Sequence, residues 1–118
     1  MQLGFIGTGA ISTAVIEGIV SGQHTICISK RSLLNSVRLS ETYQNISTNE
    51  NQGVIDNSKV VFIGLTVDKA ETVLKDLNFR KDQRVVSFMA AVSEKKIKEL
   101  VLPAKFESIM IPWPAIKN

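Results

Sequence analysis

Short apolar runs rich in β-branched residues alternate with longer amphipathic runs along the chain. The runs VVFIG and RVVSF are continuous rather than alternating, as is typical of strands that helices cover on both faces. This alternation predicts βαβ units and a parallel sheet. The expected strands are 2–6, 25–29, 45–48, 60–65, 84–89 and 107–111.

Amphipathic runs fill most of the stretches between these strands. Their apolar residues recur at three- and four-residue spacing, as Val73, Leu74 and Leu77 do, which predicts helices with one face on the sheet. Ser93 is a candidate N-cap for the last helix. The expected helices are 10–20, 33–43, 70–77 and 93–102. The fold class is therefore α/β, with a doubly wound, mostly parallel sheet in a single domain over residues 1–118.

Composition limits the kind of protein that this chain can be. Its 118 residues, 44% hydrophobic and 21% charged, are typical of one soluble globular domain. The net charge of +3 is mild and its cations are spread along the chain, so we expect no nucleic-acid partner. No apolar run reaches the roughly 18 residues of a membrane span, and strand-like sequence begins at Gln2. We therefore expect no membrane association and a cytoplasmic location.

Cysteine, acidic residues, histidine and tryptophan often carry chemistry, but they offer little here. The lone cysteine, Cys27, lies between isoleucines and is expected to be a buried thiol in a reducing compartment. The acidic residues have no neighbouring histidine or cysteine cluster, so no metal site is expected. His24 is expected on a surface loop before the second strand. Trp113, between two prolines, either packs over the sheet edge or belongs to a partner or substrate surface.

A glycine-rich turn follows the first expected strand and opens the first expected helix. This context and the G-x-G-x-x-small pattern are those of a dinucleotide fingerprint. Gly7 permits the tight turn, Gly9 lets the backbone approach a pyrophosphate, and free N–H groups at the helix start meet its charge. Ser12 is larger than the usual glycine or alanine, which weakens the match without breaking it. The residues expected to hold the pyrophosphate are Gly7, Thr8, Gly9, Ala10 and Ile11.

A basic turn, SKRS, follows the second expected strand, where an NAD site usually places an acid on the ribose 2′-hydroxyl. The turn holds no acid, and its cations and hydroxyls suit a 2′-phosphate, with Arg31 able to make a planar two-point contact. The alternative is an ordinary solvated turn, but a spacing of about 22 residues after Gly7 favours the phosphate site. The predicted cofactor is NADP(H), with its 2′-phosphate held by Ser29, Lys30, Arg31 and Ser32.

Nearly the whole chain resembles the N-terminal, Rossmann-type domain of pyrroline-5-carboxylate reductases. The resemblance is carried by the runs GFIGTGAIS, SKRS, VVFIGLTVDKAETVLKDL and VVSFMAAVS. It implies an NADPH-dependent oxidoreductase that reduces a cyclic imine, 1-pyrroline-5-carboxylate, to proline in amino-acid biosynthesis. It also implies a cofactor bound across the carboxyl ends of the first and fourth strands, with a nicotinamide site at Thr66, Val67, Ala90 and Ala91. No residue is assigned as a proton-transfer catalyst.

The chain departs from the family's pattern where a substrate would lie. Asp68-Lys69 replaces the family's Lys-Pro, Ala91 replaces a glycine, and the stretch 110–114 matches only loosely. The family also carries a helical C-terminal domain, which makes the dimer and much of the substrate pocket and which is absent from this chain. If the full protein has that domain, we expect a homo-oligomer.

Two other classes of function stay open on the sequence alone. One is another NADP-dependent oxidoreductase with the same first domain, resembling β-hydroxyacid dehydrogenases or F420-dependent NADP reductases. The β-hydroxyacid enzymes would be expected to show a glycine-rich substrate motif after the fifth strand, and MAAVS is not one. The other is a noncatalytic NADP-binding or NADP-sensing module, in which the bound cofactor changes a surface that a partner recognises.

Overall fold

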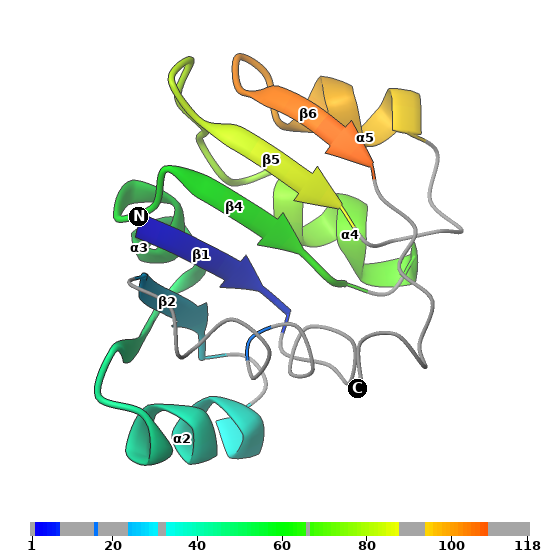
Figure 1. Cartoon of the computed structure of the whole chain (residues 1–118). Helices are drawn as coiled ribbons and strands as arrows, with labels where there is room; N and C mark the ends of the chain where they lie inside the picture. Colours follow the sequence, from blue (N-terminus) through cyan, green and yellow to red (C-terminus); the bar gives the residue numbers. More distant parts are fainter. Residues whose placement is uncertain are drawn as a thin grey trace.

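The computed structural model describes residues 2–7, 16, 24–30, 33–65, 67–87 and 94–108. Its six strands form one sheet in the order β3-β2-β1-β4-β5-β6, and every neighbouring pair runs parallel (Figure 1). The strands are β1 Gln2–Ile6, β2 Thr25–Ser29, β3 Ile46–Asn49, β4 Val60–Ile63, β5 Arg84–Ser87 and β6 Lys105–Ser108. The described helices are α2 Leu33–Thr42, α3 Asn51–Asp56, α4 Val67–Leu74 and α5 Glu94–Leu100. This topology confirms the predicted Rossmann-type α/β fold.

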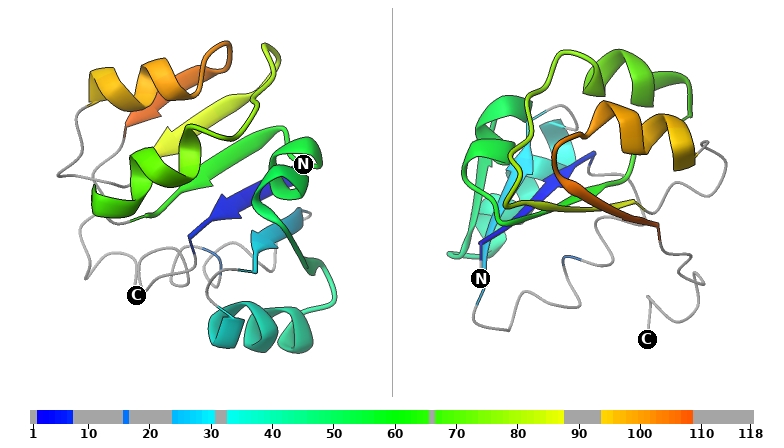
Figure 2. Two further views of the ribbon diagram at one scale, coloured as in Figure 1. Left: turned by 180° about the vertical axis from the view of Figure 1, so that it is seen from behind. Right: turned by 90° about the horizontal axis from the view of Figure 1, so that it is seen from above.

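Helices lie on both faces of the sheet, which explains its continuous apolar strands. Figure 2 shows α3, α4 and α5 together behind the sheet of Figure 1. The larger of two apolar clusters lies on that side, with Ile55, Leu74 and Ile97 packed onto strand residues. The second cluster lies on the opposite face, where Leu39 of α2 and Ile16 pack on β1 and β2. Successive side chains along each strand point to opposite faces and thus contribute to two separate cores.

The two central strands are joined by an aromatic pair as well as by the backbone. Phe5 of β1 is in register with Phe62 of β4, and their rings stack with centroids 4.7 Å apart at 13°. Such a pair contributes about 0.5–1.5 kcal/mol beyond the burial of its area. Cys27 of β2 is buried as expected, and burial raises the pKa of its thiol although a hydrogen bond with Ser47 acts in the opposite direction.

The expected elements agree with the structure apart from their boundaries and one helix. The first two strands have the predicted bounds, while the last begins at Lys105 rather than at residue 107. The helix expected over 70–77 begins earlier, at Val67. The expected helix 10–20 lies outside the described residues except for Ile16, which is helical and buried. Ser93 and Trp113 also lie outside them, and His24 is half-buried.

Helix α3 was not predicted, because its six residues, NQGVID, are too few for a periodic pattern and include a helix-weakening glycine. Tertiary contacts stabilise it instead. Val54 and Ile55 are fully buried in the larger cluster, and the segment that follows α3 joins it to β4. The short helix is therefore a product of packing rather than of intrinsic propensity.

A hydrogen-bonded network holds the end of α3 at the edge where the strands begin, called here the amino edge. Gln83 is buried, and its Nε2 donates to the carbonyl oxygens of Ile55 at 2.6 Å and Ser58 at 2.8 Å. Its Oε1 accepts from the backbone N–H of Arg80 at 2.7 Å. The Arg80 guanidinium donates to the carbonyl oxygens of Asp56 and Ser58, both at 3.1 Å. These donors satisfy carbonyls that a helix end leaves unpaired.

Among the described residues, no helix is both long enough and apolar enough to cross a membrane.

Candidate functional site

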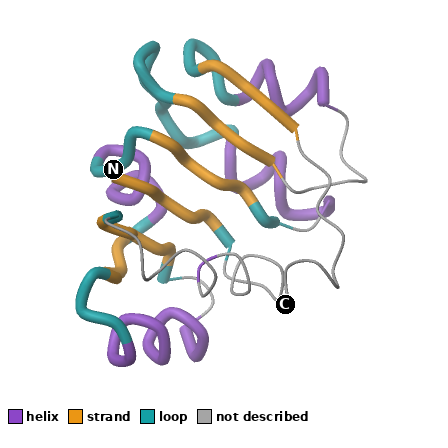
Figure 3. Tube along the Cα trace, in the orientation of Figure 1, coloured by secondary structure: helices purple, strands orange, loops and turns teal. Residues whose placement is uncertain are grey.

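The opposite edge of the sheet, where the strands end, is called here the carboxyl edge. Figure 3 shows the strands side by side, and the arrowheads in Figure 1 point toward this edge. The strand order reverses at β1, so the crevice that binds ligands in such sheets is expected outside the carboxyl ends of β1 and β4. Among the described residues, Gly7, Ser29, Lys30 and Val67 lie at this edge. The other predicted site residues lie outside the described ones: Thr8, Gly9, Ala10, Ile11, Arg31, Ser32, Thr66, Ala90 and Ala91.

Gly7 has the backbone geometry that its predicted role requires. Its φ is +88°, in the region that favours glycine. A Cβ atom at this position would also lie 2.6 Å from the carbonyl oxygen of Gly64, at the end of β4. The backbone N–H of Gly64 donates to the Ile6 carbonyl at 2.9 Å, which brings the two strand ends together. A side chain is therefore excluded here by conformation and by space.

Ser29 is tied to the protein rather than exposed at the edge. Its side chain is only 1% exposed, and its Oγ donates to Oδ1 of Asn51 at 2.6 Å, at the start of α3. A hydroxyl has one proton to donate, so donation to a phosphate would require this bond to break. The observed contact joins the end of β2 to α3. The predicted phosphate contact of Ser29 stays a prediction.

Lys30 is the described cation of the SKRS turn, and it has a partner that the local sequence did not reveal. Its side chain is about half exposed, with Nζ 3.9 Å from Oε1 of Glu50. Glu50 follows β3, and the register of β2 with β3 pairs Ser29 with Asn49, which places the two following residues side by side. The SKRS turn itself holds no acid. The signal that identifies Glu50 is strand register.

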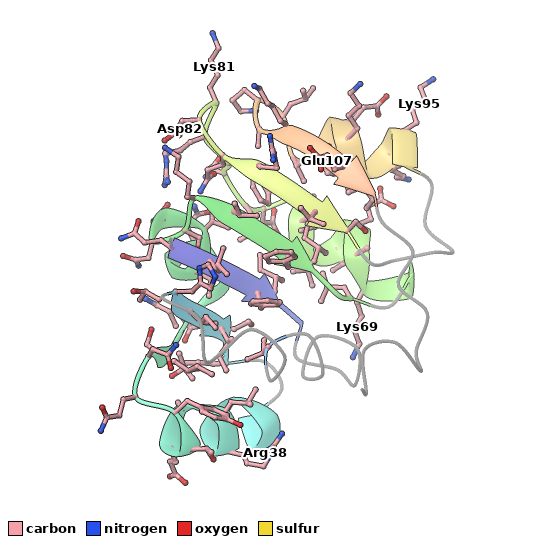
Figure 4. The ribbon with its side chains drawn as sticks, in the orientation of Figure 1. Arg38, Lys69, Lys81, Asp82, Lys95 and Glu107 are labelled. Carbon is pink, nitrogen blue, oxygen red and sulfur yellow. The ribbon has the colours of Figure 1, made fainter. Side chains whose placement is uncertain are left out.

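Lys69 extends from the first turn of α4 on the side where the strands end (Figure 4), and it is exposed. It is one of the two residues that replace the Lys-Pro of the reductase pattern. The side chain of Asp68, the other one, lies outside the described set. A cation that follows β4 in this way lies on the ligand-binding side of the sheet.

A hollow lies at the amino edge, which is the edge of the sheet opposite to the predicted site. Arg84, one of its cations, pairs with Glu107 at 3.4 Å, and Asp82 pairs with Arg80 at 3.3 Å. Figure 4 labels two of its lining residues, Lys81 and Asp82. Its lining residues are Lys59, Val60, Lys81, Asp82, Gln83, Arg84 and Lys105. Ligands of open α/β sheets bind at the carboxyl edge, so this hollow is not the predicted cofactor site.

Comparison with known proteins bears on the family and on the cofactor. The family described as "NADP oxidoreductase coenzyme F420-dependent" matches residues 2–91, which include β1 to β5 and the glycine-rich turn. Its description names NADP, the cofactor that the basic turn predicts.

Pyrroline-5-carboxylate reductases are among the similar proteins. The chain is 31% identical over 117 residues to pyrroline-5-carboxylate reductase 3 of Danio rerio, a match that covers 94% of this chain and 40% of that protein. The crystal structure of the Streptococcus pyogenes 1-pyrroline-5-carboxylate reductase aligns with a TM-score of 0.79 and 31% identity, over 93% of this chain and 42% of that one.

A more distant structure shares the fold. Plasmodium falciparum pyrroline carboxylate reductase, solved with NADP bound, aligns with a TM-score of 0.78 at 17% identity, over 98% of this chain and 44% of that one. The chain thus spans less than half of each of these three reductases. It belongs to the family described as NADP oxidoreductase, coenzyme F420-dependent, and it is similar to part of the chain of pyrroline-5-carboxylate reductases.

Proposed function

We propose that residues 1–118 are the NADP(H)-binding domain of a reductase that converts 1-pyrroline-5-carboxylate to proline. The observation that carries this proposal is the 31% identity to a pyrroline-5-carboxylate reductase across 94% of the chain. The geometry of Gly7 supports it, because a glycine with positive φ stands where the cofactor turn of such a fold begins.

The proposed site uses backbone and cations rather than an acid–base pair. The residues from Gly7 to Ile11 would hold the pyrophosphate through backbone N–H groups, and Lys30 and Arg31 would face the 2′-phosphate. Thr66, Val67, Ala90 and Ala91 would line the nicotinamide. When bound, NADPH supplies the hydride, and the chain's own residues bind and orient it. Orientation is a large part of such catalysis, since a positioned donor needs no diffusional encounter.

The imine pocket is proposed to need the rest of the protein. The chain spans 40% of the Danio rerio reductase, and its departures from the reductase pattern, at residues 68–69 and 91, fall beside the proposed nicotinamide site. A helical domain that follows this one would complete the pocket and make the homodimer. The chain alone is therefore expected to bind cofactor and to reduce the imine very slowly.

The first test is a fluorescence titration of the 118-residue chain with NADPH and with NADH. We expect tighter binding of NADPH. Arg31→Ala should weaken NADPH by about tenfold or more and NADH only slightly, because a charged hydrogen-bond pair of about 1.5–3 kcal/mol is lost with one cofactor only. Arg84→Ala is the matched control, since it removes the same charge at the amino edge.

The outcomes separate the parts of the proposal. Equal weakening of both cofactors by Arg31→Ala would exclude the 2′-phosphate role, and absence of binding by the unaltered chain would exclude the cofactor site. An assay of NADPH consumption by the whole protein with 1-pyrroline-5-carboxylate tests the substrate. Tight NADPH binding without turnover in that assay would favour a noncatalytic NADP-binding module.

A further inference from the structure

The contact between Lys30 and Glu50 changes what the carboxyl edge can recognise. The sequence of the SKRS turn predicts a purely cationic site for the 2′-phosphate. The structure adds a carboxylate, because Oε1 of Glu50 lies 3.9 Å from Nζ of Lys30. An acid near the end of the second strand is the feature that favours NAD over NADP in this type of fold. Here the acid comes from the end of the neighbouring strand.

The backbone around this pair is fixed by several contacts. The N–H of Lys30 donates to the Asn49 carbonyl at 3.1 Å, which continues the β2–β3 ladder beyond the last residues of the strands. The Oδ1 of Asn49 accepts from the backbone N–H of Glu50 at 2.8 Å. Ser29 and Asn51 are joined by their side chains. The residues on either side of the ion pair are thus tied together, which keeps the side chains of Lys30 and Glu50 within reach of each other.

The carboxylate of Glu50 does not cap the start of α3. Glu50 occupies the N-cap position, yet its side chain makes no capping hydrogen bond. Its side chain is 80% exposed. Removal of its charge should therefore leave the stability of the fold almost unchanged, since an exposed ion pair contributes little.

We propose that Glu50 is a specificity-determining residue that limits the preference for NADPH over NADH. This inference rests on the proposed function. The 2′-phosphate carries up to two negative charges, so the Glu50 carboxylate both repels it and competes with it for Lys30. NADH has only an uncharged hydroxyl at this position, so Glu50 neither repels it nor competes with it for Lys30. Glu50 thus lowers the affinity for NADPH selectively, and the site tolerates NADH better than the SKRS turn alone predicts.

The test is the Glu50→Gln variant of the 118-residue chain, titrated with NADPH and NADH at low salt. We expect the dissociation constant for NADPH to fall by about two- to fivefold, the range of an exposed charge pair, and that for NADH to stay unchanged. The gain should shrink as salt is raised, because screening weakens interactions between exposed charges. Glu99→Gln, which removes an equal charge from an exposed position of α5, is the control and should change neither constant.

Each alternative outcome has a distinct meaning. An unchanged NADPH constant in Glu50→Gln would overturn the inference, and so would tighter binding of both cofactors by the same factor. Weaker NADH binding would overturn the proposed cause, because Glu50 would then favour NADH as a ligand of the ribose hydroxyls rather than oppose the 2′-phosphate. If the unaltered chain binds neither cofactor, the proposed function itself fails. If it binds them and Glu50→Gln has no effect, only the inference fails.

Discussion

The amino and carboxyl edges of the sheet use polar side chains in different ways. At the amino edge, Gln83 is 1% exposed and bonds to backbone groups on three sides. At the carboxyl edge, Lys30 and Glu50 are 52% and 80% exposed and meet only at 3.9 Å. Buried and satisfied polar groups contribute to stability, whereas exposed pairs contribute little and stay available to a ligand. Substitutions at the two edges should therefore separate stability from binding, except where a carboxyl-edge residue also shapes the backbone.

The largest loss of stability is expected at Gly7. This residue lies at the carboxyl edge but is expected to serve both stability and binding, so the two edges do not differ there. Gly7→Ala should lower the free energy of unfolding by about 3 kcal/mol, because alanine at positive φ is strained and its Cβ would meet the Gly64 carbonyl. Urea denaturation measures this loss. NADPH binding should fall as well. A variant as stable as the parent would show that the turn relaxes without cost.

Gln83→Ala tests the amino edge by itself. We expect a loss of about 2 kcal/mol in the free energy of unfolding, because the Arg80 N–H loses its acceptor and two carbonyls lose a donor. Cofactor affinity, measured by titration of the folded protein, should not change. Gln44→Ala, at an exposed position, is the matched control. A change in NADPH affinity without a change in stability would show that Gln83 serves cofactor binding rather than the stability of the fold.

Ser29→Ala is expected to change stability less than either of these substitutions. It tests whether burial or position governs the role of a polar residue, since Ser29 is buried but lies at the ligand-binding edge. The loss of its hydrogen bond to Asn51 should cost about 1 kcal/mol of stability. NADPH should weaken less than with Arg31→Ala. A double-mutant cycle with Asn51→Ala measures the coupling of the two side chains. A large loss of NADPH affinity with no coupling would mean that the hydroxyl serves the phosphate.

Local sequence patterns predicted the secondary structure well where each segment was long or strongly apolar. The first two strands have the predicted bounds because a β-rich run ends in each case at a turn of glycine or of polar residues. Gly7 was identified as the first residue of the turn by its motif, and its positive φ agrees. Helix α3 escaped prediction because its stability comes from burial of Val54 and Ile55.

The candidate site was predicted only as far as contiguous residues define it. The SKRS turn is visible in sequence, but the acid beside it is not, because Glu50 lies 20 positions further along the chain and reaches Lys30 only through strand pairing. Ser29 was interpreted as a phosphate contact from its place in that turn. Its burial and its bond to Asn51 depend on where α3 packs.

Local sequence was enough to predict the α/β class, the glycine turn and the cationic character of SKRS, because each depends on residues within a few positions of one another. The order of the strands in the sheet, and with it the pairing of Lys30 with Glu50, is visible only in the folded chain. The same holds for the role of Gln83, whose partner Ile55 lies 28 residues away. Contacts of this kind form only when the chain folds back on itself, and side-chain chemistry alone does not specify them.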